Sequence, residues 1–411
     1  MKSTLKITAL LAVLSFAQQA SAATIRLTGS TAFRGGVHKA VVALMGGEAN
    51  CKFAHGKINL SATTANQAGY EGADYTTIQG TLSGISGTST VYCSWTGSAT
   101  GISDVASGAS IGFIPTSALP GSNGYTNAAI TQPATENAVA QIAFSDIFQS
   151  STSISTPALT DTQVAIIPFT WVANRLSTGF DNITAQQARA LFTNGLQPKS
   201  LLTGNAAHTD YVLPLGRDNG SGTRGTMLAE TKYGVFTPVQ QWKIVTAGSA
   251  GSGTVTSAQL WPIGDGEGAT SAGNGGYSSG SFIRTILGMS STSGVELLDE
   301  NGDSAGSGLA VTLVSCLGVG DAVTAVTNGG VRLKYEGVLY DGSNPDLIYN
   351  GLYTMWGYLH LYTNGAAAGD LLTFKNGIGT QLDNPAVLGS NGLRVTQMLV
   401  GRQFDGAVVG P

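Results

Sequence analysis

The residues best suited to chemistry lie in the segment 217–224, which reads Arg-Asp-Asn-Gly-Ser-Gly-Thr-Arg. The planar guanidinium of Arg217 can hold an oxyanion through two parallel hydrogen bonds. The Gly-Ser-Gly-Thr turn that follows supplies consecutive backbone N–H groups and two hydroxyls. It lies at the predicted start of a helix, whose positive end favours negative charge. The segment therefore indicates a site for a small anion. The alternative is a glycine-rich turn in which Thr223 only caps the helix.

Three further predicted strands end in small hydroxyl or acidic residues where a helix or turn begins. One such end is weak evidence, because serine and threonine are ordinary helix caps. Several of them in one chain, converging between two lobes, favour an anion site built from helix starts and hydroxyls. The strands are residues 24–27, 90–94 and 141–144, and they run into Gly29-Ser30-Thr31, Gly97-Ser98 and Ser145-Asp146.

The elements that must position these residues alternate between strand and helix. This alternation predicts an α/β architecture with mostly parallel sheets. Residues 164–173 form a long apolar strand suited to passing between two lobes, and Thr184 and Gln187 have the spacing of a capping box. Since single cores rarely exceed about 250–300 residues, a chain of 411 residues predicts two lobes.

The N-terminus predicts export from the cytoplasm. Lys2 and Lys6 precede the apolar residues 7–16, and Ala20-Ser21-Ala22 is a typical cleavage signal. We therefore expect residues 1–22 to be a signal peptide, cleaved near Ala22, and the mature protein to be periplasmic or secreted. The apolar run is shorter than the roughly 20 residues that span a bilayer, and we expect no membrane span in the mature chain.

Charge and cysteine content exclude some functions. The chain has 20 Lys and Arg against 24 Asp and Glu, the opposite of the basic balance typical of nucleic-acid binders, so no nucleic-acid partner is expected. In an oxidising compartment one disulfide is plausible, and we predict that Cys51 pairs with Cys93. Cys316 lies in an apolar run and is predicted to be a buried small residue. The cysteine spacing does not indicate a zinc site, and no cofactor is expected.

In their order along the chain, these motifs resemble the phosphate-binding proteins of bacterial phosphate-specific ABC importers. The resemblance implies the type II periplasmic-binding-protein fold, with two α/β lobes joined by crossover strands and a ligand cleft between them. It implies a non-enzymatic protein that binds inorganic phosphate for an ABC transporter permease, and we expect a monomer. The similar segments are residues 28–33, 97–101, 143–146, 172–174 and 217–223, and more weakly 348–353. We place the first lobe at residues 23–172, the second at 173–308, and a return to the first at 309–411.

The resemblance also implies which residues contact the ligand. By position, Ser98 would donate a hydrogen bond, Asp146 would accept the proton of a bound phosphate, and Arg217 would hold the ion from the other lobe. Asn219 stands where the family often has an aspartate that supports the arginine, and Arg34 stands where the family tends to have proline. The implied ligand-binding residues are Ser30, Thr31, Ala32, Phe33, Ser98, Asp146, Arg217, Asn219, Ser221, Gly222 and Thr223.

Other patterns indicate other functions less well. Residues 276–280 match the nucleophile elbow of hydrolases, but no strong strand precedes them. Gly220, Gly222 and Gly225 match the dinucleotide fingerprint, without an acidic residue about 20 positions later. Two alternatives stay open beside phosphate uptake. One is an exported phosphatase that uses the same oxyanion cradle, and the other is a scavenging or structural protein of the cell surface.

Overall fold

A computed structural model describes residues 22–56, 69–125, 136–262, 275–389 and 392–411. All but the last residue of the predicted signal peptide lie outside these ranges, so its cleavage stays a prediction. None of the described helices has the length and apolar character needed to cross a bilayer.

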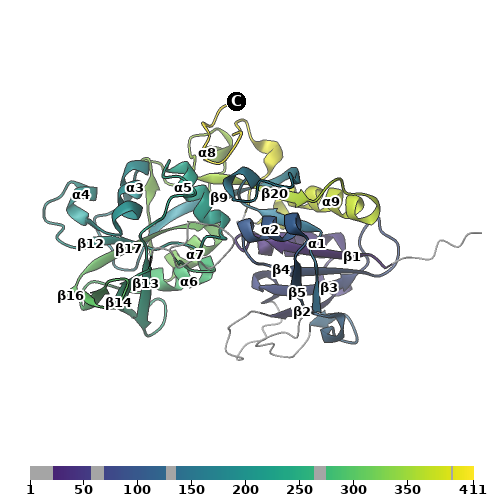
Figure 1. Ribbon diagram of the computed structural model, residues 1–411, viewed down its shortest axis with the longest axis horizontal. Coiled ribbons are helices and arrows are strands. Elements are labelled where there is room, and N and C mark those ends of the chain that lie inside the picture. Colours follow the sequence, from purple (N-terminus) through teal and green to yellow (C-terminus); the bar gives the residue numbers. More distant parts are fainter. Residues whose placement is uncertain (1–21, 57–68, 126–135, 263–274, 390–391) are drawn as a thin grey trace, which may run out of the picture.

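One twelve-stranded sheet runs through two lobes (Figure 1). The predicted α/β class with two lobes is confirmed. In spatial order the strands are β11 (Gln197–Pro198), β12 (Tyr211–Pro214), β17 (Val311–Gly318), β9 (Thr160–Ala173), β20 (Trp356–Thr363), β8 (Ile142–Ser145), β1 (Thr24–Gly29), β4 (Ser89–Ser94), β3 (Tyr75–Gly80), β2 (Lys52–Gly56) and β6 (Gly124–Tyr125), while β18 (Val331–Arg332) pairs with β9.

Strand β9 joins the lobes, as its long apolar sequence predicted. Its first part, through Pro168, pairs with β20 in the first lobe, and its last part, from Phe169, pairs with β17 in the second. Residues 164–173 are buried throughout, because the strand is covered on both faces. The fully buried Trp171 and Trp356 belong to a core that includes residues of both lobes. The lobes are therefore connected through the middle of one hydrophobic core.

The capping box predicted at Thr184 and Gln187 is confirmed at the start of α3 (Ala185–Asn194). Each side chain accepts a hydrogen bond from the other residue's backbone N–H.

Helices cover the sheet in each lobe. The first lobe contains α1 (Arg34–Leu44), α2 (Ser98–Ser107), α9 (Gly369–Leu382) and α10 (Pro385–Leu388). The second contains α3 (Ala185–Asn194), α4 (Lys199–Thr203), α5 (Gly222–Glu230), α6 (Gly280–Leu287) and α7 (Val319–Thr327), and α8 (Asp346–Tyr349) follows.

The prediction of mostly parallel sheets is wrong. Strands β2, β3 and β4 form an antiparallel meander, and β9 is antiparallel to β17, β18 and β20. The strands that end at the predicted site are nevertheless parallel: β1 lies between β4 and β8, and β12 pairs with β17. Three smaller sheets complete the part of the fold that the described residues form. They are β13 (Trp242–Ala247), β14 (Thr254–Leu260), β15 (Val295–Leu298) and β16 (Ser304–Leu309); β10 (Asn182–Ile183) and β19 (Lys334–Tyr335); and β5 (Ser110–Phe113) and β7 (Glu136–Val139).

The chain returns to the first lobe later than predicted. Strands β17 and β19 pair with β12 and β10, so the chain from Val311 to Tyr335 still belongs to the second lobe. Strand β20 then pairs with β8 of the first lobe. The boundary predicted at residue 309 therefore falls between Tyr335 and Trp356.

The predicted disulfide is also wrong, because Cys51, Cys93 and Cys316 are all free and buried. Strand β3 lies between β2, which begins just after Cys51, and β4, which contains Cys93. Two strand spacings amount to about 9.5 Å, whereas a disulfide requires Cα atoms within about 7 Å. Cys316 is buried as expected.

Helix α2 packs on strand β1 with no room for a side chain at Gly101. A Cβ atom there would lie 2.5 Å from the Cα of Gly29. We predict that Gly101→Ala lowers the free energy of unfolding by about 2 kcal/mol, since backbone must move. The matched control is Gly379→Ala in α9, where the nearest atom, Val164 Cγ1, lies 3.8 Å away. This variant should be neutral or more stable by up to about 1 kcal/mol. Equal urea-unfolding midpoints for both variants would contradict this packing.

Candidate functional site

Four of the predicted segments meet where the two lobes touch. The N–H of Ser30 donates to the carbonyl of Phe144 at 2.8 Å, and that of Gly97 donates to Gly29 at 2.9 Å. The N–H of Ala99 donates across the lobes to the carbonyl of Gly220 at 3.0 Å. The ends of β1, β4 and β8 and the start of α5 therefore lie side by side, as the anion-site hypothesis requires.

Glycine permits this close approach. Gly97 has a φ of 111°, and a Cβ atom on it would lie 2.6 Å from the carbonyl oxygen of Gly220. At Gly222, a Cβ atom would lie 2.8 Å from Asp146 Cβ and would also collide with Ser98 Oγ. The first turn of α5 thus lies directly against the acidic and hydroxyl residues of the other lobe, and its N–H groups bring the positive end of a helix to this point.

Asp146 is a buried acid at the centre of the junction, with a residue exposure of 1%. Its N–H donates to Ser98 Oγ at 3.2 Å. Burial raises the pKa of Asp146 to about 6, although the hydroxyls of Ser30 and Ser98 and the charge of Arg217 oppose this shift. Within the described residues, its Oδ1 atom and the Ser30 hydroxyl make no well-formed hydrogen bond. Buried polar atoms of this kind normally have partners, so the pair is suited to a bound polar ligand.

Arg217 reaches the same point from the second lobe and is 4% exposed. Its Nε donates to the carbonyl of Tyr277 at 2.8 Å, and its Nη2 donates to the carbonyl of Ser278 at 2.8 Å and to Thr31 Oγ1 at 3.1 Å. The guanidinium is therefore held by the backbone of one lobe and already contacts a hydroxyl of the other.

Asn219 does not support Arg217 as the resemblance implied. Its Nδ2 atom is buried and has no hydrogen-bond partner among the described residues, while two backbone carbonyls hold the guanidinium instead. Asn219 lines a small cavity beside the junction, together with Ala99, Ile147 and Ser221. The backbone carbonyls of Tyr277 and Ser278 thus take the place of the expected side-chain partner.

The remaining predicted residues have different roles. Ser221, not Thr223, caps α5, since its Oγ accepts from the N–H of Arg224 at 3.3 Å. Thr223 is buried. The ring of Phe33 is fully buried and packs against Gly36 and Gly392, so the ring belongs to the core. Thr31 and Ala32 are half-buried at the same turn.

Sequence reasoning missed the segment that orients the arginine. Tyr277 and Ser278 lie in the pattern that matched a nucleophile elbow, yet their carbonyls hold Arg217, and Tyr277 forms an isolated bridge with it. Gly276, with a φ of 112°, allows the two backbones to touch. The preceding pair of glycines was the available signal for such a close approach. Arg34 follows the same turn as Thr31; it is buried, pairs with Asp74 at 3.0 Å, and adds positive charge near Arg217.

The described residues contain no group of three or more His, Cys, Asp or Glu side chains that could hold a metal ion. The buried histidines have other partners. His38 receives a hydrogen bond from Trp95 Nε1 at 2.9 Å, and His360 pairs with Asp161 at 2.9 Å. The chemistry of the site is therefore that of N–H groups, hydroxyls, one guanidinium and one carboxyl.

No model of a known protein family matches the chain, and no curated protein matches its sequence. The solved structures that match include phosphate receptors of the kind that the motifs resemble. One is an ABC-type phosphate transport receptor from Vibrio cholerae, with 13% identity, 90% of this chain and 99% of that chain covered, and a TM-score of 0.46. Another is a phosphate-binding protein from Stenotrophomonas maltophilia, with 13% identity, 92% of each chain covered, and a TM-score of 0.42. Because the identity and the TM-scores are this low, the ligand of this protein must be inferred from the site itself.

The raised pKa of Asp146 predicts a cost in stability. Because the folded protein holds the proton up to pH of about 6 and the unfolded chain releases it near 4, stability should fall as the pH rises through this interval. Without ligand, Asp146→Asn should be more stable than the wild type by about 2 kcal/mol at pH 7.5, and equally stable near pH 4. The control is Asp303→Asn, in an exposed loop. Its free energy of unfolding should differ from that of the wild type by the same amount at both pH values. A destabilised Asp146→Asn at pH 7.5 in urea unfolding would contradict this assignment.

Proposed function

We propose that this protein is an exported solute-binding protein that holds inorganic phosphate, or a similar tetrahedral oxyanion, between its two lobes for ABC-type uptake. One observation supports the proposal above the others. The hydroxyl of Ser30 and the Oδ1 atom of Asp146 are buried without a well-formed hydrogen bond among the described residues, at the junction that Arg217 and the start of α5 reach from the other lobe.

The mixture of donors with one acceptor favours a protonated oxyanion. Arg217, the hydroxyls and the N–H groups at the helix starts can donate to oxygens that carry negative charge. A carboxylate among them is unfavourable unless the ligand brings a proton to share. Phosphate has such a proton at neutral pH, and fully ionised sulfate does not. Asp146 would therefore select phosphate, since sulfate would leave two acceptors facing each other.

The position of the site between the lobes supports binding coupled to closure. Ser30, Ser98 and Asp146 belong to the first lobe, and Arg217 and α5 belong to the second. Only a closed arrangement lets one small ion contact both sets, so the ligand would shift an open–closed equilibrium toward the closed form. Each of these groups is a hydrogen-bond partner for a bound ion, and we assign no catalytic step to them. A membrane permease would receive the closed form.

Selectivity is the first test of this proposal. In titration calorimetry, the mature protein should bind phosphate at least about 100-fold more tightly than sulfate, the ratio expected from a mismatch of roughly 3 kcal/mol. Asp146→Asn should lose most of this preference, because an amide can donate to an oxygen that has no proton. Equal affinity of the wild type for both anions would contradict a phosphate-selective site.

Arginine removal is the second test. Arg217→Gln should weaken phosphate binding by about 30-fold or more, because a charge-assisted pair of hydrogen bonds is lost. The matched control is Arg175→Gln, since Arg175 also lies in the second lobe and donates to a backbone carbonyl, that of Ser252. The control should bind phosphate like the wild type. The same loss in both variants would show a general effect of charge instead of a contact at the site.

A further inference from the structure

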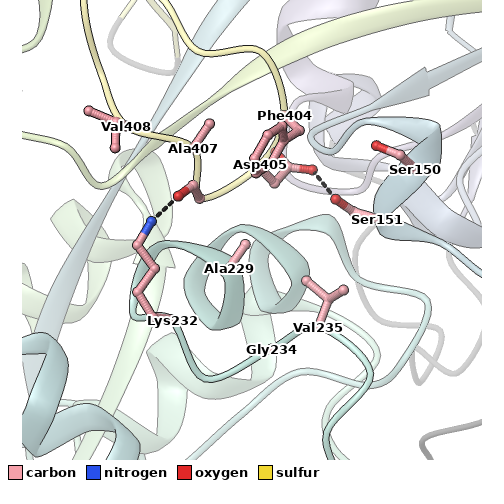
Figure 2. Close-up of a pocket in the computed structure, with 11 residues that line it drawn as sticks. Ser150, Ser151, Ala229, Lys232, Gly234, Val235, Phe404, Asp405, Ala407 and Val408 are labelled. Atoms are coloured by element: carbon pink, nitrogen blue, oxygen red, sulfur yellow. Dashed lines mark hydrogen bonds between the residues drawn. The ribbon is translucent and has the colours of Figure 1, made fainter.

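The C-terminal segment 402–406 contacts both lobes, and Figure 2 shows its contacts with Ser151 and Lys232. Asp405 bonds to the first lobe, where its Oδ2 accepts from the N–H of Phe148 at 2.8 Å and from Ser151 Oγ at 2.6 Å. Gly406 bonds to the second lobe, where its carbonyl accepts from Lys232 Nζ. One short stretch of chain thus bridges the two halves that form the site.

The first of these contacts holds the segment that presents Asp146. Phe148 follows Asp146 by two residues, and the turn between them is closed by Ser145, whose Oγ accepts from the N–H of Ile147 at 3.1 Å. Asp405 is buried, at 7% residue exposure, and its carboxyl accepts the hydrogen bond from the N–H of Phe148. Movement of Asp405 would therefore move the turn that fixes the direction of the Asp146 side chain.

The second contact holds the far end of α5. Arg402 pairs with Glu230, the last residue of α5, at 3.0 Å, and donates to the carbonyl of Thr354 at 2.7 Å. Its guanidinium lies 4.1 Å from the ring centre of Trp356 on the strand β20. Since a short helix moves as a unit, this pair restrains Gly222 at the other end of α5 as well.

Besides these polar contacts, the backbone at Gly406 lies directly against the carbonyl of Ala229 in α5. A cavity of about 740 Å³ lies between the segment, the end of α5 and residues 150–151. Phe404 is 55% exposed and Val408 is 87% exposed, so these large apolar side chains contribute little packing. The polar contacts of Asp405, Arg402 and Gly406 therefore hold the segment against both lobes.

We propose that Asp405 and Arg402 are positioning residues of the anion site, in which Asp405 fixes the turn that presents Asp146 and Arg402 fixes α5. This inference rests on the proposed function for its effect on ligand binding. The two residues act on different parts of the site. Asp405 governs the acceptor that distinguishes phosphate from sulfate, while Arg402 governs donors that both anions use.

The test compares phosphate and sulfate affinities by calorimetry. Asp405→Ala should lower phosphate affinity about tenfold and reduce the phosphate-to-sulfate ratio, since the hydrogen-bond acceptor of Phe148 and Ser151 is lost. Asp405→Asn should keep most of the phosphate affinity and most of the phosphate-to-sulfate ratio, because its Oδ1 can still accept from Phe148 and Ser151. Arg402→Lys should weaken the binding of both anions. It should change the phosphate-to-sulfate ratio less than Asp405→Ala does, because among the described residues α5 contacts Asp146 only through the Thr226 hydroxyl at 3.2 Å and the close approach of Gly222.

The matched control is Asp383→Ala. Asp383 is also an acid that holds the C-terminal region, through Arg394 at 3.0 Å and Thr396 at 2.7 Å, but it lies at the end of α9. Its loss should lower the melting temperature without changing either affinity. If Asp405→Ala and Asp383→Ala change the ratio equally, or if neither changes it, Asp405 has only a structural role and the inference is overturned.

A readout without ligand separates this inference from the proposed function. In Asp405→Ala, amide hydrogen exchange should become faster in peptides covering residues 145–151, while Asp383→Ala should leave these peptides unchanged. If the wild type binds neither anion, the proposed function fails, and the exchange experiment still decides whether Asp405 positions the turn. Unchanged exchange in Asp405→Ala would overturn the positioning role.

Discussion

The burial of one carboxyl group among anion-binding donors is the constraint on which the rest of this structure depends. Asp146 is almost fully buried, and its pKa is raised mainly because water is excluded from it. An ionised acid at this place costs stability in the free protein, and the fold compensates only in part through Ser30, Ser98 and Arg217. Destabilising residues of this kind are retained where they serve function. Here the shared proton of a bound oxyanion would remove the loss of stability that ionised Asp146 causes.

The fold explains how so many donors reach one carboxyl. The parallel strands β1, β4 and β8 end at one edge of the sheet, so their last residues and the helices that follow lie together. Strand β9 then carries the sheet into the second lobe, and α5 returns to the same edge with Arg217 just before it. Because rigid elements hold each group, little order has to be gained when an ion binds. The contact between Arg217 and Thr31 shows that the two lobes already share this point.

Local patterns predicted the parts of the site that local chemistry determines. Glycine followed by a hydroxyl residue indicated the ends of β1 and β4, and the capping box indicated the start of α3. What the sequence could not indicate depends on contacts between distant residues. The carbonyls that hold Arg217 come from 60 and 61 residues further along the chain, and Asp405 meets Phe148 across 257 residues. The disulfide prediction failed for the same reason, since no local signal shows that β3 separates Cys51 from Cys93.

A crystal structure of the mature protein grown with phosphate would test the central claim most directly. The account predicts tetrahedral density between the lobes, within hydrogen-bond distance of Ser30 Oγ, Asp146 Oδ1 and the guanidinium of Arg217. Phosphate bound elsewhere, or a closed protein in which Asp146 and Arg217 meet each other with no ion between them, would contradict it.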